Sequence, residues 1–263
     1  MIRSLRLLLT CSVAVAILSA VVAEAQPQTT APPPARPARP AAAKEPADSP
    51  AVKGDPNDPN NRFLKRHEGF LQDLKAANGK VGVLFVGDSI TDGWRRTGKA
   101  TFDKTYGPLD PLNLGIGGDR TQHVLWRLEH GEVEGISPKV AVLMIGTNNL
   151  GSNTNEEIAA GVTRIVRTLH AKLPRTKVLL LAIFPRSAKA EDPARARIKA
   201  INEQLAKLDD GGRTVKYLDI GDKFLASDGT LPREVMPDAL HPNEKGYEIW
   251  AEAMAPALAE LMK

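Results

Sequence analysis

The sequence predicts a three-layer α/β/α sandwich built on a mainly parallel sheet of five strands. Short apolar runs alternate with longer helix-like segments throughout the chain after residue 60. The runs are too short and too continuous for amphipathic helices, and they match strands that are buried on both faces. Strands that alternate with helices in this way are typical of an α/β fold with a parallel sheet.

The expected elements follow one another in regular order. Apolar runs predict strands over residues 81–86, 111–116, 139–146, 177–185 and 214–220. Apolar residues at helical spacing predict helices over residues 61–79, 121–131, 154–174, 193–209 and 242–262. Asn78 and Gly79 end the first helix, and either Thr154 or Asn155 is placed to cap the third.

Two segments precede this alternating region. Residues 1–25 combine a charged start, an apolar run and the small residues Ala23 and Ala25, as a cleaved signal peptide does. We therefore expect a secreted or periplasmic protein, with an uncleaved membrane anchor as the alternative. Residues 26–60 are rich in Pro and Ala and predict a disordered linker. The globular domain is expected over residues 61–263.

Composition argues against several classes of function. The 35 basic and 31 acidic residues give a formal net charge of +4, and no basic block points to nucleic acid. Cys11, the only cysteine, falls in the signal segment, so the mature chain would lack disulfides, zinc thiolates and a cysteine nucleophile. No metal or cofactor is expected, because four histidines lie in predicted helices without a second ligand at metal spacing: His67, His123, His130 and His170.

Four polar loops are expected to meet at one edge of the sheet, because ligands bind at the carboxyl ends of parallel strands. Ser89 follows the first strand, where its hydroxyl can act as a nucleophile and its backbone N–H can face an oxyanion. The structural alternative is that Asp88 and Ser89 form an ordinary helix cap.

A base for this serine is available near the C-terminus. Asp238 and His241 stand three residues apart before the last helix. The carboxylate can hold the imidazole in the tautomer that accepts a proton from Ser89. A hydrogen bond at the helix entry is the non-catalytic interpretation of the pair.

The two remaining loops can supply further donors to an oxyanion. Residues 115–119 read GIGGD and residues 146–149 read GTNN. The backbone N–H of Gly118 and the side-chain amide of Asn148 can join the Ser89 N–H in this role. Taken singly, each loop also has a plain interpretation, as turn glycines and as an asparagine cap.

Together these motifs resemble the four blocks of the SGNH hydrolases, also called GDSL esterases and lipases. The blocks are GDSI, GIGGD, GTNN and DALH, at residues 87–90, 115–119, 146–149 and 238–241. Residues 113–149 are similar in particular to the platelet-activating factor acetylhydrolase branch of that family. The resemblance covers the chain from about Arg62 onward, with Ile90 in place of the usual leucine and Asn149 where many members have aspartate.

The resemblance implies a flavodoxin-like fold and the activity of a serine carboxylic ester hydrolase. It implies that Ser89 is the nucleophile, His241 the general base and acid, and Asp238 the residue that orients the histidine. Ser89, Gly118 and Asn148 would form the oxyanion hole.

The substrate is less closely defined than the chemistry. Because the chain is expected to be exported, we expect short acyl groups, acetyl above all, on carbohydrate. A lipid or lysophospholipid esterase and a non-catalytic carbohydrate-binding protein on the same fold are the alternatives. Loops over residues 95–110 and 187–193 are expected to shape the pocket. A homodimer, as in the acetylhydrolase branch, stays open.

Overall fold

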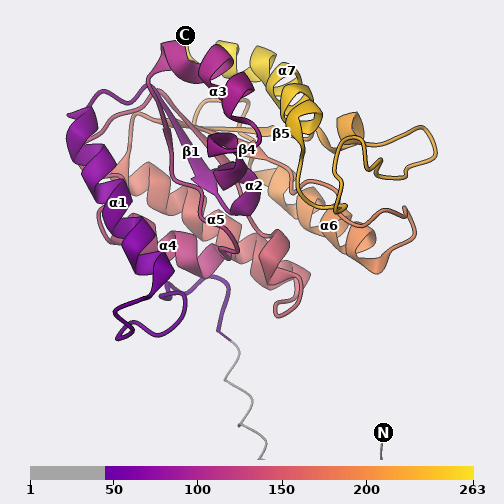
Figure 1. The fold of residues 1–263 in the computed structure, drawn as a ribbon, viewed down its shortest axis with the longest axis horizontal. Helices are drawn as coiled ribbons and strands as arrows, with labels where there is room; N and C mark the ends of the chain where they lie inside the picture. Colours follow the sequence, from indigo (N-terminus) through magenta and orange to yellow (C-terminus); the bar gives the residue numbers. More distant parts are fainter. Residues whose placement is uncertain (1–44) are drawn as a thin grey trace, which may run out of the picture. The chain divides into compact units, whose positions relative to one another are not determined.

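Five parallel strands form one sheet in the order β2-β1-β3-β4-β5 (Figure 1). The strands are β1 (Val83–Gly87), β2 (Pro111–Asn113), β3 (Val140–Met144), β4 (Lys177–Leu181) and β5 (Val215–Leu218). The computed structural model describes residues 45–263. The predicted signal peptide and the first part of the predicted linker lie outside the described residues.

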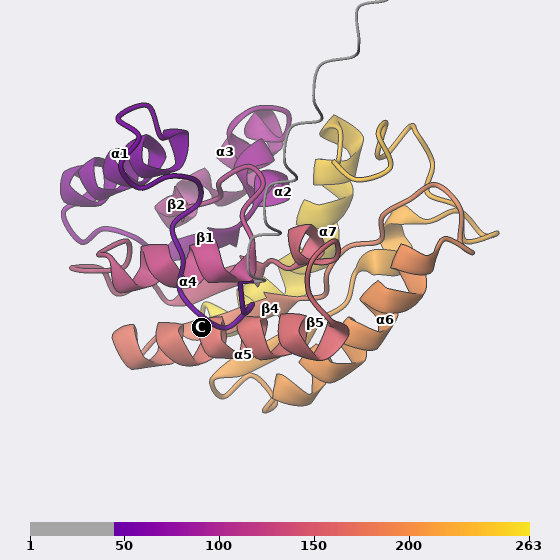
Figure 2. The same cartoon turned by 90° about the horizontal axis from the view of Figure 1, so that it is seen from below.

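Helices cover both faces of this sheet (Figures 1 and 2). One face packs against α1 (Arg62–Ala77), α4 (Thr121–Glu129), α5 (Asn155–Lys172) and α6 (Pro193–Leu205). The other packs against α7 (Glu244–Leu261) and the short helices α2 (Ser89–Asp92) and α3 (Lys99–Tyr106). Single 3₁₀ turns complete the elements: η1 (Gly93–Arg95), η2 (Gly107–Leu109), η3 (Thr147–Asn149), η4 (Ala206–Leu208) and η5 (Gly221–Phe224). The predicted three-layer sandwich is confirmed.

The strands contribute to two separate cores because successive side chains point to opposite faces. Leu84 and Val86 of β1 belong to the core under α1, α4, α5 and α6. Val83 and Phe85 belong to the core under α7. All five residues of β1 are buried, which explains why this strand reads as a continuous apolar run.

Side-chain caps begin the long helices α1, α5, α6 and α7. Asn61 Oδ1 accepts hydrogen bonds from the backbone N–H groups of Phe63 and Leu64, at 2.9 and 3.2 Å. Thr154 caps α5 by accepting from the N–H of Glu157, whose carboxylate accepts from the N–H of Thr154 in return. These reciprocal bonds satisfy N–H groups that have no partner within a helix, and they select Thr154 over Asn155 as the cap.

The packed chain extends further toward the N-terminus than the predicted boundary at residue 61. Ala47 is 1% exposed, and its carbonyl accepts a hydrogen bond from Thr121 Oγ1 at 2.6 Å. Gly161 of α5 leaves room for this contact, since a Cβ there would lie 2.5 Å from the Ala47 oxygen. We call residues 45–60 the strap. The Pro- and Ala-rich composition of the strap does not predict these contacts. They are made by backbone atoms with residues more than 70 positions away in sequence.

Residues 95–110, which the sequence treats as a loop, contain α3. Phe102 and Tyr106 place their rings 5.1 and 5.0 Å from the ring of Phe85 on β1. Trp94 packs beside them, with its ring 5.6 Å from that of Tyr106. The segment therefore covers the sheet, and its few apolar positions are too sparse to show a helical period. In residues 45–263, no helix is both long and apolar enough to span a membrane.

Tyr247→Phe is expected to reduce the free energy of unfolding by about 1–2 kcal/mol. The Tyr247 hydroxyl is buried and donates to the Ile90 carbonyl at 2.7 Å, which joins α7 to α2. Phenylalanine would leave that buried carbonyl without its donor. Urea denaturation monitored by circular dichroism measures the change.

Tyr106→Phe is the matched control. Tyr106 is also buried, but its hydroxyl has no hydrogen-bond partner among the described residues. Its removal should leave the free energy of unfolding within about 0.5 kcal/mol of the wild type or raise it slightly. Equal losses in the two variants would contradict the role given to the Tyr247 hydrogen bond.

Candidate active site

Ser89 lies at the carboxyl end of β1, as the first residue of α2. Asp88 caps this helix, with its Oδ1 accepting from the N–H of Ile90 at 2.9 Å. A Cβ on Gly87 would lie 2.4 Å from the Met144 carbonyl oxygen of β3. Since no side chain fits there, glycine allows the chain to turn against β3 and brings Ser89 to the sheet edge.

The structure brings Ser89, His241 and Asp238 together across 152 residues of sequence. Ser89 Oγ lies 2.9 Å from His241 Nε2, and His241 Nδ1 lies 2.6 Å from Asp238 Oδ2. A carboxylate only accepts hydrogen bonds, so Nδ1 carries the proton and Nε2 can accept one from the serine. The arrangement can therefore convert a serine hydroxyl into a nucleophile.

Backbone contacts hold the loop that carries this pair. Asp238 Oδ1 accepts from the N–H groups of Leu240 and His241, at 3.1 and 2.7 Å. Burial opposes ionisation, but hydrogen bonds from the His241 side chain and backbone hold the pKa of Asp238 below its usual value. Asp238 thus remains ionised and able to orient the imidazole.

The GIGGD loop approaches Ser89 closely. A Cβ on Gly117 would lie 4.0 Å from the Ser89 Cβ, and one on Gly115 would lie 2.3 Å from the Asp92 nitrogen of α2. Gly118 adopts a left-handed conformation with φ of 73°. Glycine is required where the backbone turns in this way, directly beside the serine.

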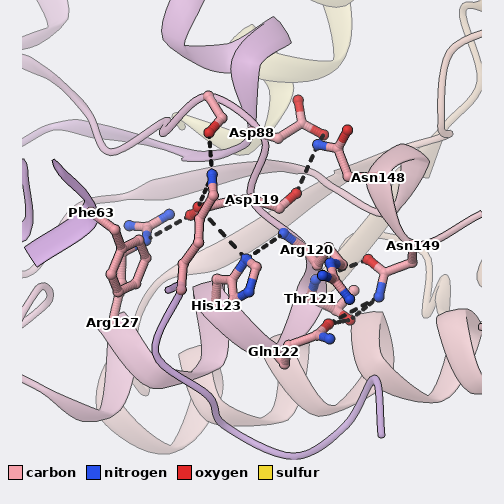
Figure 3. Close-up of polar contacts among 12 residues, drawn as sticks. Phe63, Asp88, Asp119, Arg120, Thr121, Gln122, His123, Arg127, Asn148 and Asn149 are labelled. Carbon is pink, nitrogen blue, oxygen red and sulfur yellow. Dashed lines mark hydrogen bonds and ion pairs between the residues drawn. The ribbon is translucent and has the colours of Figure 1, made fainter. Parts of the chain in front are cut away.

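Asn148 joins this loop to the end of β1. Its Nδ2 donates to the Asp119 carbonyl at 2.8 Å and lies 3.5 Å from Asp88 Oδ2, as Figure 3 shows. The amide nitrogen carries two hydrogens, and the contact with Asp88 is long for a hydrogen bond. One hydrogen of the Asn148 amide therefore holds the GIGGD loop through the Asp119 carbonyl. The second hydrogen is the one that would donate to an oxyanion in the predicted role of Asn148.

Asn149 is buried and organises the start of α4 (Figure 3). Its Oδ1 accepts from the N–H of Thr121 at 3.0 Å. The two hydrogens of its Nδ2 are shared among three oxygens at 3.0–3.1 Å: Thr121 Oγ1, Gln122 Oε1 and Asn153 Oδ1. An aspartate at this position could not donate those bonds, which accounts for the asparagine here.

A buried ionic cluster lies behind the GIGGD loop. Arg127, fully buried on α4, donates from Nε to Asp119 Oδ2 at 3.0 Å and from Nη1 to Glu132. His67 Nδ1 lies 2.8 Å from the second oxygen of Glu132. The motifs in the sequence do not predict this cluster. The sequence shows only a single arginine on the apolar face of a helix. That pattern indicates a buried charge but does not identify the residues that pair with it.

The four histidines other than His241 each contact another group of the protein. His123 Nδ1 accepts from the Arg120 N–H at 3.0 Å, and burial lowers the pKa of His123 to about 3, so it is neutral. Two others contact backbone carbonyls: His130 at Trp126 and His170 at Thr214. Within residues 45–263, no group of three or more His, Cys, Asp or Glu side chains could hold a metal ion.

The Ser89 site is open to solvent. The His241 and Asp238 side chains are 42% and 56% exposed. A pocket of about 620 Å³ lies elsewhere, beyond the ends of β4 and β5. It is lined in part by Pro185 and Ala190, and by neither Ser89 nor His241. The His241 and Asp238 side of the site is therefore accessible from solvent.

Asp88→Asn is expected to change how stability depends on pH. Burial raises the pKa of Asp88 from 3.8 to about 7. The folded state thus keeps a proton that the unfolded chain has already lost, so this group's stabilisation is complete below pH 3.8 and is lost as pH rises through about 7. Relative to the variant, the wild type should lose up to about 1.4 kcal/mol per pH unit in this window.

Urea denaturation of both proteins from about pH 5 to 8 measures that difference. Other buried groups, including His123, are present in both proteins and largely cancel. Asp103→Asn, at an exposed position on α3, controls for the loss of one carboxylate and should follow the wild-type slope. A wild-type minus Asp88→Asn difference that stays constant with pH would contradict the prediction.

Comparison with known proteins places these features in a family. The model of the GDSL-like lipase/acylhydrolase family matches residues 85–249. Platelet-activating factor acetylhydrolase IB subunit alpha2 of Rattus norvegicus is 38% identical over 188 residues, which cover 72% of this chain and 80% of that protein. Subunit alpha1 of Bos taurus is 35% identical over 211 residues, covering 80% and 86%.

Solved structures share the fold at lower identity. An acylhydrolase from Bacteroides fragilis aligns with a TM-score of 0.63 at 21% identity, covering 74% of this chain and 97% of that one. A mutant of an acetyl-xylooligosaccharide esterase from Geobacillus aligns with a TM-score of 0.54 at 20% identity, covering 69% and 96%. Because the family model spans more than half of the sequence and the mammalian relatives exceed 30% identity, the chain belongs to the GDSL-like lipase/acylhydrolase family of ester hydrolases.

Proposed function

We propose that this chain is an exported serine esterase that removes short acyl groups, acetyl in particular, from carbohydrate. The observation that carries the proposal is the hydrogen-bonded series from Ser89 through His241 to Asp238, with contacts of 2.9 and 2.6 Å. Nucleophile, base and orienting carboxylate stand within the reach that acyl transfer requires.

In the proposed reaction, Ser89 Oγ attacks the ester carbonyl while His241 Nε2 takes the serine proton. The tetrahedral intermediate collapses when its bond to the alcohol oxygen breaks, and His241 returns the proton to that oxygen. Water then attacks the acyl-enzyme, with His241 again accepting a proton. Breakdown of the second intermediate releases the acid and restores the Ser89 hydroxyl.

Three donors are proposed to stabilise the oxyanion: the N–H groups of Ser89 and Gly118 and the side-chain amide of Asn148. The approach of the GIGGD loop to Ser89 supports the first two, since Gly117 lies against the serine. Contact of Asn148 with Asp119 and Asp88 supports the third, because it keeps the amide at the same edge. Fixed donors of this kind are often the largest single contribution to acyl transfer.

A short acyl group is favoured by the names of related proteins and by the surface. Both the mammalian acetylhydrolases and the structurally similar xylooligosaccharide esterase are named for acetyl. Among the described residues, Leu71 on α1 is the large hydrophobic side chain that is exposed, at 36%. A long acyl chain would need a larger apolar surface near Ser89.

The carbohydrate esterase and the lipid esterase differ in the alcohol part of the substrate. Export, inferred from residues 1–25, and the open setting of His241 favour an acylated polysaccharide. The mammalian relatives are named for a lipid, platelet-activating factor, which keeps a lipid or lysophospholipid ester as the alternative. A non-catalytic carbohydrate-binding protein is disfavoured, since binding alone does not require a base hydrogen-bonded to Ser89.

Ser89→Ala is expected to reduce kcat/KM for p-nitrophenyl acetate by about 10⁴-fold or more, because the nucleophile is lost. A fluorophosphonate probe should label the wild type at Ser89 and leave the variant unlabelled. Ser137→Ala serves as the control and should retain wild-type rates. Ser137 is exposed and stands just before β3, at the amino ends of the strands and so away from Ser89. Turnover by Ser89→Ala close to that of the wild type would remove Ser89 from the role.

Asn148→Ala is expected to lower kcat by about 100-fold if the amide is an oxyanion donor. The change should fall on kcat more than on KM, since the charge on the oxygen develops only in the transition state. Steady-state kinetics with p-nitrophenyl acetate measures both constants. An unchanged kcat would leave Asn148 with only its contact to the Asp119 carbonyl.

The acyl preference is tested with p-nitrophenyl esters from acetate to decanoate. The proposal predicts that kcat/KM is highest for acetate and falls with chain length. Acetylated xylan and a lysophospholipid, compared at equal ester concentration, then separate the two alcohol classes. A preference for decanoate together with turnover of the lysophospholipid would favour the lipid alternative.

A further inference from the structure

We propose that Lys53, carried by the strap, is a positioning residue for the oxyanion hole. It fixes the peptide bond between Gly117 and Gly118 and thereby directs the Gly118 N–H. The inference rests on the proposed function, in which that N–H stabilises the oxyanion. It adds to the site a residue that lies outside all four motif blocks.

Contacts place the Lys53 ammonium directly over the GIGGD loop. Lys53 Nζ donates a hydrogen bond to the Gly117 carbonyl oxygen. The same nitrogen lies 3.7 Å from Asp119 Oδ1, a buried oxygen without a hydrogen-bond partner among the described residues. A Cβ on Gly118 would come within 2.9 Å of Nζ, so the ammonium also packs on Gly118.

The geometry of a peptide bond links this contact to catalysis. The Gly117 carbonyl and the Gly118 N–H belong to one planar trans peptide and point in opposite directions. Holding the carbonyl oxygen therefore fixes the direction of the N–H. Gly117 faces Ser89, so this peptide borders the space in which the oxyanion would form.

The two glycines leave the peptide bond between them free to take more than one orientation, so an outside contact can select one. Without a Cβ, both residues have access to many backbone conformations, and Gly118 occupies the left-handed region at a φ of 73°. Arg127 and Asn148 hold the following residue, Asp119, through its side chain and its carbonyl. Lys53 supplies a contact to the Gly117–Gly118 peptide, to which the proposed donor belongs.

The strap keeps Lys53 in place. The Lys53 carbonyl accepts from Asn61 Nδ2 at 2.9 Å, which ties the strap to the start of α1. The Ala51 N–H donates to the Gln122 carbonyl at 3.0 Å, which ties it to α4. With Ala47 buried at the start of the strap, the backbone on both sides of Lys53 is anchored.

A positive charge at this position also suits the reaction. The ammonium partly balances the charge of Asp119, which would otherwise repel a negative oxygen forming nearby. It polarises the Gly117–Gly118 peptide, so the N–H becomes a stronger donor. Both effects should be larger in the transition state than in the ground state, and the loss of Lys53 should therefore appear in kcat.

Lys53→Met in the full chain tests the inference. The substitution keeps an apolar stem over the loop and removes the ammonium. We expect kcat for p-nitrophenyl acetate to fall about tenfold, less than for loss of a direct donor, with KM within about twofold of the wild type. Lys53→Arg, which restores a cation that can donate to the Gly117 carbonyl, should recover most of that loss.

Lys139→Met is the matched control. Lys139 Nζ also donates to a backbone carbonyl, that of Met262 at 2.8 Å, far from Ser89 in the fold. This variant should keep the wild-type kcat. If Lys53→Met fails to fold, as judged by circular dichroism, Lys53→Leu, which also lacks a donor, replaces it with the same expectations.

The outcomes separate this inference from the proposed function. A wild type without Ser89-dependent turnover would overturn the proposed function and this inference with it. An active wild type with unchanged kcat in Lys53→Met would overturn the inference alone. A fall in kcat that Lys53→Arg does not recover would also overturn it, since the ammonium's contact would then not be what matters.

Discussion

The close approach of β1 to β3 at Gly87 fixes the position of every group at the candidate site. A side chain at Gly87 would collide with the Met144 carbonyl and with Thr91, so the turn exists only because none is present. That turn makes Asp88 the cap of α2 and Ser89 its first residue. The GIGGD loop then packs on α2, and His241 reaches Ser89 from the far end of the chain.

Holding these loops together requires charges inside the protein. Asp119 and Glu132 are fully buried, and Arg127 lies between their carboxylates. Burying charges costs free energy that ion pairs recover only when their geometry is good, so such clusters add little net stability. Their effect is directional, because Arg127 and Asn148 hold Asp119, the last residue of the GIGGD loop, by its side chain and its carbonyl.

The site combines rigid support with an open surface. Behind Ser89, buried hydrogen bonds join both Asn149 and the strap to Thr121 at the start of α4. In front, His241 and Asp238 are partly exposed, and their loop is held mainly by its own hydrogen bonds. Such a site can keep donors and nucleophile in fixed geometry while accepting substrates that are too large to be enclosed.

The amino-acid sequence alone was sufficient to predict the fold class, the succession of strands and helices and the residues of the candidate site. Apolar period and strand length are local properties, and a parallel sheet must carry the loops after its strands to one edge, where Ser89, Gly118 and Asn148 were expected. The folded structure was needed to identify the strap, α3, the Arg127 cluster and the contact of Lys53 with Gly117. The strap, the His67–Glu132 contact and the Lys53 contact join residues more than 60 positions apart through single polar contacts, and α3 has few apolar positions. Neither feature leaves a periodic signal in the chain.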